Sequence, residues 1–256
     1  MLFPSRRMSP AWLLAAALLP SFAALQSATA LTLYEAEATC PVDGQTFRAT
    51  LVASYTSTGT RLDLKPVGDV IAPYRYPVCP GSGFVVYRSE FSGDEIAAIR
   101  SIAASDEFKA LRAKHTDHAV VAYVKQRLGA GEFDAALSYL QASWEAERDR
   151  PQLVDEYRTL ALEGFDAARA RGNLSLDDRQ TAMVVSAELE RLLGDFSAAA
   201  ERITSLVLEL AADGAAGNAA LMTAVEQIAQ HTYNRRAQPQ VLSDQTSQGT
   251  VGSGAR

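Results

Sequence analysis

Two cysteine-containing turns carry the clearest chemistry in the sequence. They read Cys-Pro-Val-Asp-Gly at residues 40–44 and Cys-Pro-Gly-Ser-Gly at residues 79–83. Structural zinc sites use pairs of Cys-Pro-x-Cys-Gly turns, in which each turn supplies two thiolates to a tetrahedral ion. Here Asp43 and Ser82 stand where the second cysteines would be. The turns therefore predict the geometry of a zinc site with half of its thiolates replaced.

A disulfide is the first of three chemistries open to Cys40 and Cys79. The chain has 2 cysteines, so only one pairing exists. Two facing turns would bring the thiols together, and an oxidising compartment would join them. Closing the loop between them would stabilise the fold by about 4 kcal/mol if the gain is chain entropy. We expect this disulfide and no cofactor.

Zinc binding and a free thiol are the two alternatives. A zinc ion would be held by Cys40 and Cys79 together with Asp43, or with His115 and His118, whose spacing suits one face of a helix. The expected helix start falls between these histidines, which weakens that set. A free catalytic or redox thiol would make the protein a metal or thiol sensor. Redox pairs usually form Cys-x-x-Cys, which is absent here.

The first thirty residues have the pattern of a secretory signal peptide. Arg6 and Arg7 precede an apolar run at residues 11–19, and small residues end at Ala30. The run is shorter than the roughly 20 apolar residues that span a membrane. We expect cleavage of residues 1–30, no membrane span afterwards, and a periplasmic or secreted protein.

The rest of the chain changes character near residue 92. Residues 31–91 hold half of the chain's prolines and short runs of β-branched and aromatic residues, which predicts strands and turns. From residue 92 to 235 apolar residues recur at helical spacing. Residues 236–256 are polar, and we expect this tail to be disordered.

The helical part contains a recurring motif. Gly-x-Phe-x-x-Ala occurs at residues 131–136 and again at 194–199, and a related Phe-Asp-Ala-Ala begins at Phe165. Such intervals are typical of stacked helical pairs, in which Gly permits the turn and Ala permits close approach. We expect an α+β, mostly α protein, with antiparallel helical hairpins of tetratricopeptide-like type. A plain helical bundle is the alternative.

These features together resemble a bacterial family, domain of unknown function 2225. The resemblance rests on both cysteine turns, Leu-Asp-Leu-Lys-Pro at residues 62–66, the block at residues 77–87 and the helical part, and covers about residues 38–210. In that family a zinc-ribbon-like head precedes tetratricopeptide-like helices, and no reaction is established. The resemblance implies a bacterial protein with a degenerate zinc-ribbon-like head at residues 31–91.

Composition and the absence of known motifs exclude several classes of function. The net charge is -6 and hydrophobic residues are 48% of the chain, which argues against disorder along the whole chain and against nucleic-acid binding by bulk charge. We find no phosphate loop, dinucleotide fingerprint or hydrolase motif, and we assign no catalytic residue.

Interaction with a protein or peptide is the function that the sequence favours. Stacked helical hairpins present a concave surface suited to such partners. His118, Lys125, Glu188 and Arg191 are the predicted groove-facing polar residues, with solvent-facing polarity as the plain explanation. The alternatives are an envelope hydrolase with its site where head and helices meet, and a metal or thiol sensor.

Overall fold

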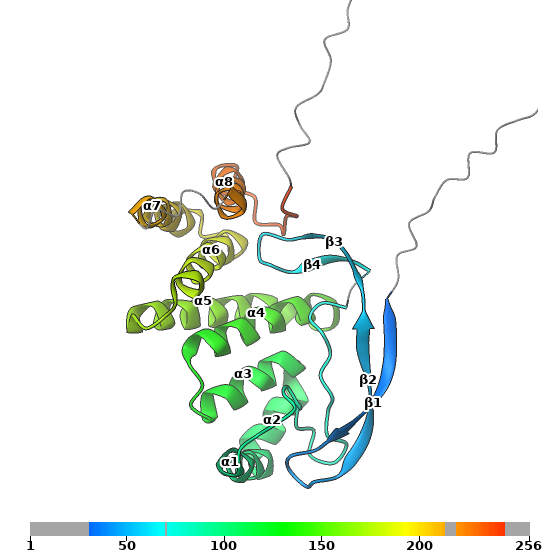
Figure 1. Ribbon diagram of the computed structural model, residues 1–256. Coiled ribbons are helices and arrows are strands. Elements are labelled where there is room, and N and C mark those ends of the chain that lie inside the picture. Colours follow the sequence, from blue (N-terminus) through cyan, green and yellow to red (C-terminus); the bar gives the residue numbers. More distant parts are fainter. Residues whose placement is uncertain (1–30, 70, 213–218, 244–256) are drawn as a thin grey trace, which may run out of the picture.

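The computed structural model describes residues 31–69, 71–212 and 219–243, so the predicted signal peptide lies outside the described residues. A small β-rich head lies beside a stack of helices (Figure 1). The strands are β1 (Thr32–Thr39), β2 (Thr46–Ser54), β3 (Thr56–Thr60) and β4 (Pro66–Asp69). The helices are α1 (Gly93–Ala104), α2 (Asp106–Lys114), α3 (Asp117–Arg127), α4 (Glu132–Asp149), α5 (Val154–Arg171), α6 (Leu176–Leu192), α7 (Phe196–Ala212) and α8 (Ala219–Tyr233). The predicted α+β, mostly α fold is confirmed.

The head is built from two antiparallel strand pairs, β1–β2 and β3–β4. In the first pair Ala36 lies opposite Ala49 and Ala38 lies opposite Phe47. These four residues are half-buried while their neighbours along the strands are exposed, as the period of two predicts for a ribbon with one inward face. Three of the four are alanine, so the inward face is shallow.

Both cysteine turns adopt the same backbone geometry. The Gly44 N–H donates to the Cys40 carbonyl at 2.8 Å, and the Gly83 N–H donates to the Cys79 carbonyl at 2.9 Å. Both glycines have positive φ, 76° and 68°, which few other residues adopt without strain. The turns bring the two Cα atoms to 5.5 Å, and the predicted Cys40–Cys79 disulfide is confirmed.

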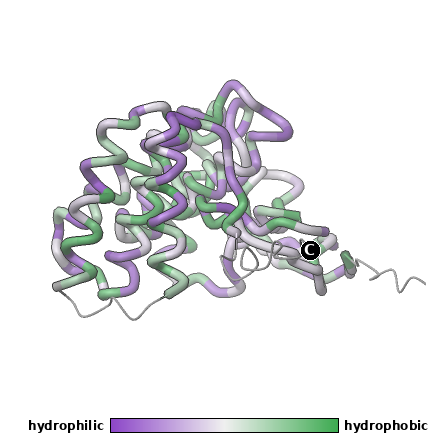
Figure 2. Tube along the Cα trace, turned by 90° about the horizontal axis from the view of Figure 1, so that it is seen from above, coloured by the Kyte–Doolittle hydropathy of each residue, from purple (hydrophilic) through white to green (hydrophobic). Residues whose placement is uncertain are grey.

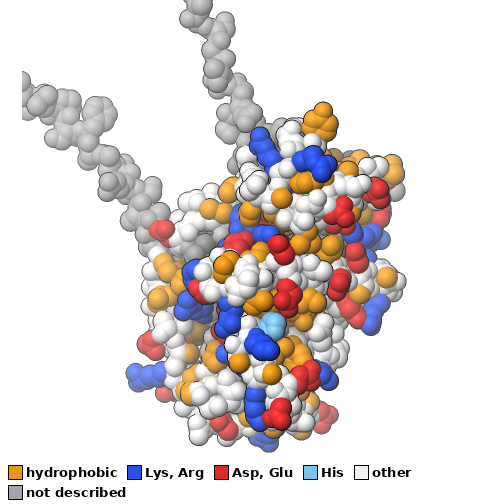
Figure 3. All heavy atoms as spheres, turned by 180° about the vertical axis from the view of Figure 1, so that it is seen from behind, with side chains coloured by type: hydrophobic (Ala, Val, Ile, Leu, Met, Phe, Trp, Pro, Cys, Tyr) orange, Lys and Arg blue, Asp and Glu red, His pale blue; other side chains and the backbone are white. Residues whose placement is uncertain are grey.

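From α3 to α7, consecutive helices pack side by side and reverse direction at short turns (Figure 1). Of the two motif glycines, Gly194 has positive φ in the turn that follows α6, whereas Gly131 has negative φ and is the N-cap of α4. The positive φ in the turn after α3 belongs to Gly129, which lies outside the motif. The backbones of α4 and α5 approach closely at Gly164. A Cβ added there would lie only 2.9 Å from the Ala136 Cβ, so a larger residue would not fit without a shift. Hydrophobic and hydrophilic residues alternate along the helices (Figure 2). On the face opposite Figure 1, acidic and basic side chains are interspersed (Figure 3).

The C-terminal segment corrects the expectation of a disordered tail. Residues 236–243, here called the strap, return from α8 to the head, whereas residues 244–256 lie outside the described residues. The Leu62 N–H donates to the Gln240 carbonyl at 3.0 Å, and the Leu242 N–H donates to the Thr60 carbonyl at 2.8 Å. The strap therefore pairs with the head along the end of β3, which composition could not reveal.

A buried ion cluster fastens the head to α4. Glu147 accepts hydrogen bonds from Arg61 at 2.7 and 2.8 Å and from Lys65 at 2.7 Å. Asp63, which is buried, binds the Nε of Arg61 at 2.9 Å. Burial alone would raise the pKa of Glu147, but the hydrogen bonds from Arg61 and Lys65 outweigh it and hold that pKa below its usual range.

Removal of the disulfide should destabilise the protein by about 4 kcal/mol, because the bond joins residues 39 positions apart. The measurement is urea unfolding of Cys40→Ala/Cys79→Ala against the oxidised protein. Dithiothreitol should weaken the unsubstituted protein to the level of the variant and leave the variant unchanged. Equal stability of the oxidised protein and the variant would contradict the prediction.

Loss of the Glu147 carboxylate should change how stability depends on pH. Because its folded-state pKa is lowered, its contribution is present above pH about 4.5 and is lost as the pH falls through the folded-state value. Glu147→Gln should cost about 2 kcal/mol at pH 7 and flatten the decline of stability below pH about 4.5. Urea unfolding from pH 3 to 7 measures both, with exposed Glu156→Gln as the matched control. Parallel profiles for Glu147→Gln and the unsubstituted protein would refute the assignment.

Candidate functional site

A cleft of about 690 Å³ opens between the inward face of β1–β2 and the segment 74–89. We call it the tyrosine cleft, because its lining includes Tyr34, Tyr55, Tyr74, Tyr76 and Tyr87. The shallow alanine face of the ribbon leaves this space. Burial of a ligand there would remove much aromatic surface from water.

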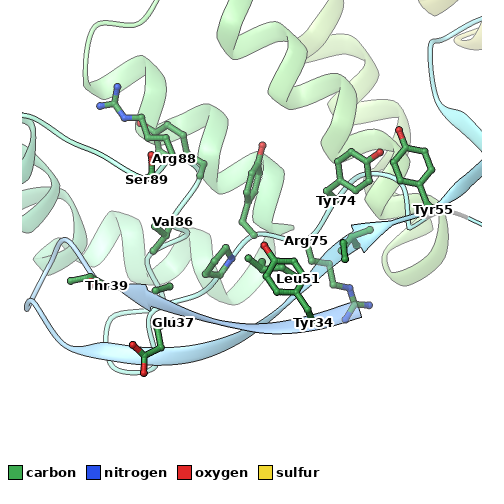
Figure 4. A pocket seen from close by; sticks show the side chains of 16 residues that line it. Tyr34, Glu37, Thr39, Leu51, Tyr55, Tyr74, Arg75, Val86, Arg88 and Ser89 are labelled. Atoms are coloured by element: carbon green, nitrogen blue, oxygen red, sulfur yellow. The ribbon is translucent and has the colours of Figure 1, made fainter. Parts of the chain in front are cut away.

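Two contacts join the walls of the tyrosine cleft. Cys40, which follows β1 and the lining residue Thr39, is bonded to Cys79 in the segment 74–89. Tyr55, which follows β2, packs on Tyr74 with ring centroids 5.4 Å apart (Figure 4). The walls are therefore held at a set separation by a covalent bond and a ring contact.

The second wall is anchored on the hydrophobic core of the head. Val78 bridges Val85, and the Val86 N–H donates to the Pro77 carbonyl at 2.8 Å. Tyr76, Val86 and other partly buried side chains pack against the cluster that contains the disulfide. Tyr76 and Val86 therefore pack against the core and also line the cleft.

Three tyrosines of the cleft, Tyr74, Tyr76 and Tyr87, have pKa values raised above the usual value for tyrosine. Burial, followed by the hydrogen bond and charge of Tyr55, raises the pKa of Tyr74 to about 12. Burial also raises the pKa of Tyr76. Tyr34, Tyr55 and Tyr74 remain 47%, 42% and 41% exposed, so their rings form the mouth of the cleft.

Three charged side chains line the cleft, and two of them are directed elsewhere. Figure 4 shows Glu37 and Arg88 pointing away from the cavity and Arg75 lying beside Tyr34. Arg88 forms an ion pair with Glu95. Within the described ranges no acidic side chain forms an ion pair with Arg75. The cleft thus contains one guanidinium whose charge is not neutralised locally.

A second cavity of about 390 Å³, the junction cavity, lies between the head and helices α3 and α4. Arg75 lines both cavities, and the junction cavity also has Arg61, Lys65 and Arg148 in its wall. Arg61 and Lys65 are neutralised by the ion cluster, and Arg148 binds Asp149 at 2.7 Å. Most of the cationic charge of this cavity is therefore already paired.

His118 and Glu145 form the one imidazole–carboxylate pair of the junction cavity. The His118 Nδ1 lies 3.0 Å from Glu145 Oε2, and the backbone N–H groups of Asp117 and His118 also donate to this carboxylate. Thr116 makes no side-chain cap, so Glu145 caps α3 in its place. Burial favours a higher pKa for Glu145, but its bonds to His118 lower it on balance. Among the described lining residues there is no Ser, Thr or Cys to act as a nucleophile.

The four predicted groove residues are not brought together. His118 is buried against Glu145, and Lys125 donates to Ser138 at 3.0 Å. Glu188 and Arg191 are fully buried and bind each other through both Glu188 oxygens. Arg191 also donates to the Arg236 and Gln238 carbonyls of the strap. Glu188 and Arg191 therefore hold the strap rather than face a groove, which corrects the prediction for this pair.

The alternative zinc ligands are not assembled either. Cys40 and Cys79 are bonded to each other, while His115 lies 3.0 Å from the Tyr157 hydroxyl. Ser82, which stands where a zinc turn would have its second cysteine, has its Oγ 3.9 Å from the Cys40 sulfur. In the part of the chain that the structure describes, no three His, Cys, Asp or Glu side chains are grouped to hold a metal ion. Asp43 accepts a hydrogen bond from Gln45.

The tyrosine cleft was missed by reasoning from sequence. Its signal was compositional: five of the 9 tyrosines fall in residues 31–91. That enrichment does not say which rings meet, because strand pairing and the disulfide bring the five together.

No protein-family model, curated protein or solved structure matches the chain. The resemblance to a family of unknown function therefore stays a prediction. None of the helices in the described ranges is long and apolar enough to cross a membrane.

Substitution of Arg191 should release the strap and destabilise the fold by about 3 kcal/mol, because Glu188 would stay buried without its cation. Burial already raises the pKa of Glu188, so the cost of Arg191→Met should be larger at pH 8 than at pH 5, where the carboxyl takes up a proton more readily. Urea unfolding at both pH values measures this.

The double variant Glu188→Gln/Arg191→Met is the matched control, since it removes the unpaired charge and should regain part of the loss. Limited proteolysis should cut Arg191→Met near residue 236. A loss of stability in Arg191→Met that is below about 1 kcal/mol and independent of pH would contradict this role of Arg191 in holding the strap.

Proposed function

We propose that the protein is an exported binding module that holds a peptide or a segment of a partner protein in the tyrosine cleft. The observation that carries this proposal is the cleft itself, about 690 Å³ with five tyrosines in its lining. Tyrosine gives a large contact area at low cost in side-chain entropy, and it is enriched where proteins bind other proteins. The head is then the binding part, and the helices are its support.

The chemistry of the lining favours a peptide over a sugar. Tyrosine hydroxyls and the Arg75 guanidinium donate hydrogen bonds, which suits the carbonyl oxygens of a peptide. Sugar hydroxyls need many acceptors as well, and among the described lining residues the only carboxylate is Glu37, which points away (Figure 4). Apolar side chains of a peptide would pack on the rings.

Preorganisation supports a binding role. The two walls of the cleft are joined by the disulfide and by the Tyr55–Tyr74 contact. A ligand would therefore enter a site whose walls are already in place, which reduces the entropic cost of binding. The disulfide also supports export to the periplasm or beyond, because such bonds persist in oxidising compartments.

The hydrolase alternative has one observation in its favour. His118 lines the junction cavity where head and helices meet, and its ring is oriented by Glu145. The same carboxylate caps α3, which accounts for the pair without any reaction. A sensor that uses free thiols has less support, because both cysteines are in the disulfide.

Truncation of a cleft tyrosine should weaken peptide binding by at least about tenfold, since a buried aromatic anchor contributes more than 1 kcal/mol. Peptides would be selected from a random displayed library on the disulfide-intact protein, and their affinities would be measured by fluorescence anisotropy. Tyr74→Ala is the test variant. Tyr233→Ala is the control, because Tyr233 is 85% exposed on α8, away from the cleft. Equal affinities for the two variants would rule out the cleft as the site.

A further inference from the structure

We infer that the ligand of the tyrosine cleft carries a carboxylate, and that Arg75 selects it. This inference rests on the proposed function and adds the chemical class of the ligand. An acidic side chain and a free peptide C-terminus present the same group. The partner is thus a peptide segment with an apolar or aromatic side chain on the tyrosines and a carboxylate on Arg75.

The charges of the cleft lead to this ligand. Arg88 is occupied by Glu95 and by the face of Phe91, 4.4 Å from the ring centroid. Glu37 lies on the outward side and pairs across the ribbon with Arg48 in the strand register. Arg75 is exposed and lines the cleft beside Tyr34 (Figure 4). Its charge is thus available to a ligand.

The surroundings of Arg75 outside the cleft do not neutralise it. Asp149 is an acidic group that responds to Arg75, since the charge of Arg75 contributes to the lowering of the Asp149 pKa. The larger cause is the hydrogen bonding of Asp149 to Arg148, at 2.7 Å for both oxygens. Its carboxylate is therefore engaged by another guanidinium and makes no ion pair with Arg75.

Desolvation makes this charge selective. A guanidinium cannot lose its proton at physiological pH, so a ligand that covers Arg75 must supply acceptors or leave a charge without water. A neutral apolar ligand would bear that penalty, and a basic ligand would add repulsion. A carboxylate fits the planar fork of the guanidinium with two parallel hydrogen bonds.

The tyrosines do not oppose an anion. The pKa of Tyr74, raised to about 12 by burial and by Tyr55, keeps that ring protonated and neutral. Tyr34, beside Arg75, exposes its ring at the mouth of the cleft. The net charge of -6 acts over a longer range and is screened beyond roughly 8 Å at physiological salt. Local attraction to Arg75 therefore decides the sign of the preference.

The test is an array of eight-residue synthetic peptides, each with a Phe or Tyr and one varied position. The varied position holds Asp, Asn or Lys, and every peptide is made with a free and an amidated C-terminus. The disulfide-intact full chain is measured beside Arg75→Gln, Arg75→Lys and Arg88→Gln. Arg88→Gln is the control, because it removes the other arginine of the cleft and leaves Arg75 in place. Thermal unfolding verifies that each variant is folded.

The unsubstituted protein should bind carboxylate peptides about tenfold or more tighter than their amide counterparts. Arg75→Gln should reduce that ratio to about twofold without weakening the amide peptides, Arg75→Lys should keep part of it, and Arg88→Gln should keep it all. Comparison of the amidated Asp peptides with the Asn peptides that have a free C-terminus identifies which carboxylate Arg75 binds. Binding without a preference for carboxylates, or a preference that Arg75→Gln leaves intact, overturns the inference while the binding function stands. An array on which no peptide binds refutes both.

Discussion

The bond between Cys40 and Cys79 is the constraint on which the head depends. It joins the residue after β1 to the segment 74–89, so the same bond lies in the small core and links the two walls of the tyrosine cleft. Each cysteine turn contains a glycine with positive φ, and the two turns bring the cysteines together. Asp43 and Ser82 occupy the fourth position of these turns, and the covalent link needs no metal ion. Because a disulfide needs no ligand exchange, the walls stay in register in any oxidising compartment.

Elsewhere in the molecule, ion pairs connect separate parts of the fold. The cluster of Arg61, Asp63, Lys65 and Glu147 ties the head to α4, and the pair of Glu188 and Arg191 ties the strap to α6. Buried ion pairs gain little stability over apolar contacts of the same size, but a wrong arrangement leaves a charge without a partner. Their effect is therefore to define one way in which the head, helices and strap fit together. The helical stack itself is held by apolar clusters on facing sides of neighbouring helices.

Local signals made part of this structure predictable. Ser92 caps α1 with a full capping box, the glycines of the repeated motif lie at the start of α4 and after α6, and two cysteines permit one disulfide. The features that were missed all depend on distant partners. Glu188 and Arg191 look like surface residues of a polar helix until the strap covers them. The polar residues of the strap suggested disorder, because its hydrogen bonds are made by backbone groups and leave no pattern in the side chains. The tyrosine cleft likewise exists only after β1–β2 and the segment 74–89 have met.

The strap also sets an order of events during synthesis. Arg61 bridges Val241 across about 180 positions of chain, so the edge of β3 is completed only after residue 241 has been made. Contacts between such distant segments form late, since the entropic cost of closing the long intervening loop precedes the gain from the hydrogen bonds. Until then Arg191 has none of the strap carbonyls that it binds in the finished fold. A nascent chain that lacks residues 236–243 therefore lacks the partners of both the β3 edge and Arg191, whereas the partners of the helices before the strap are already present.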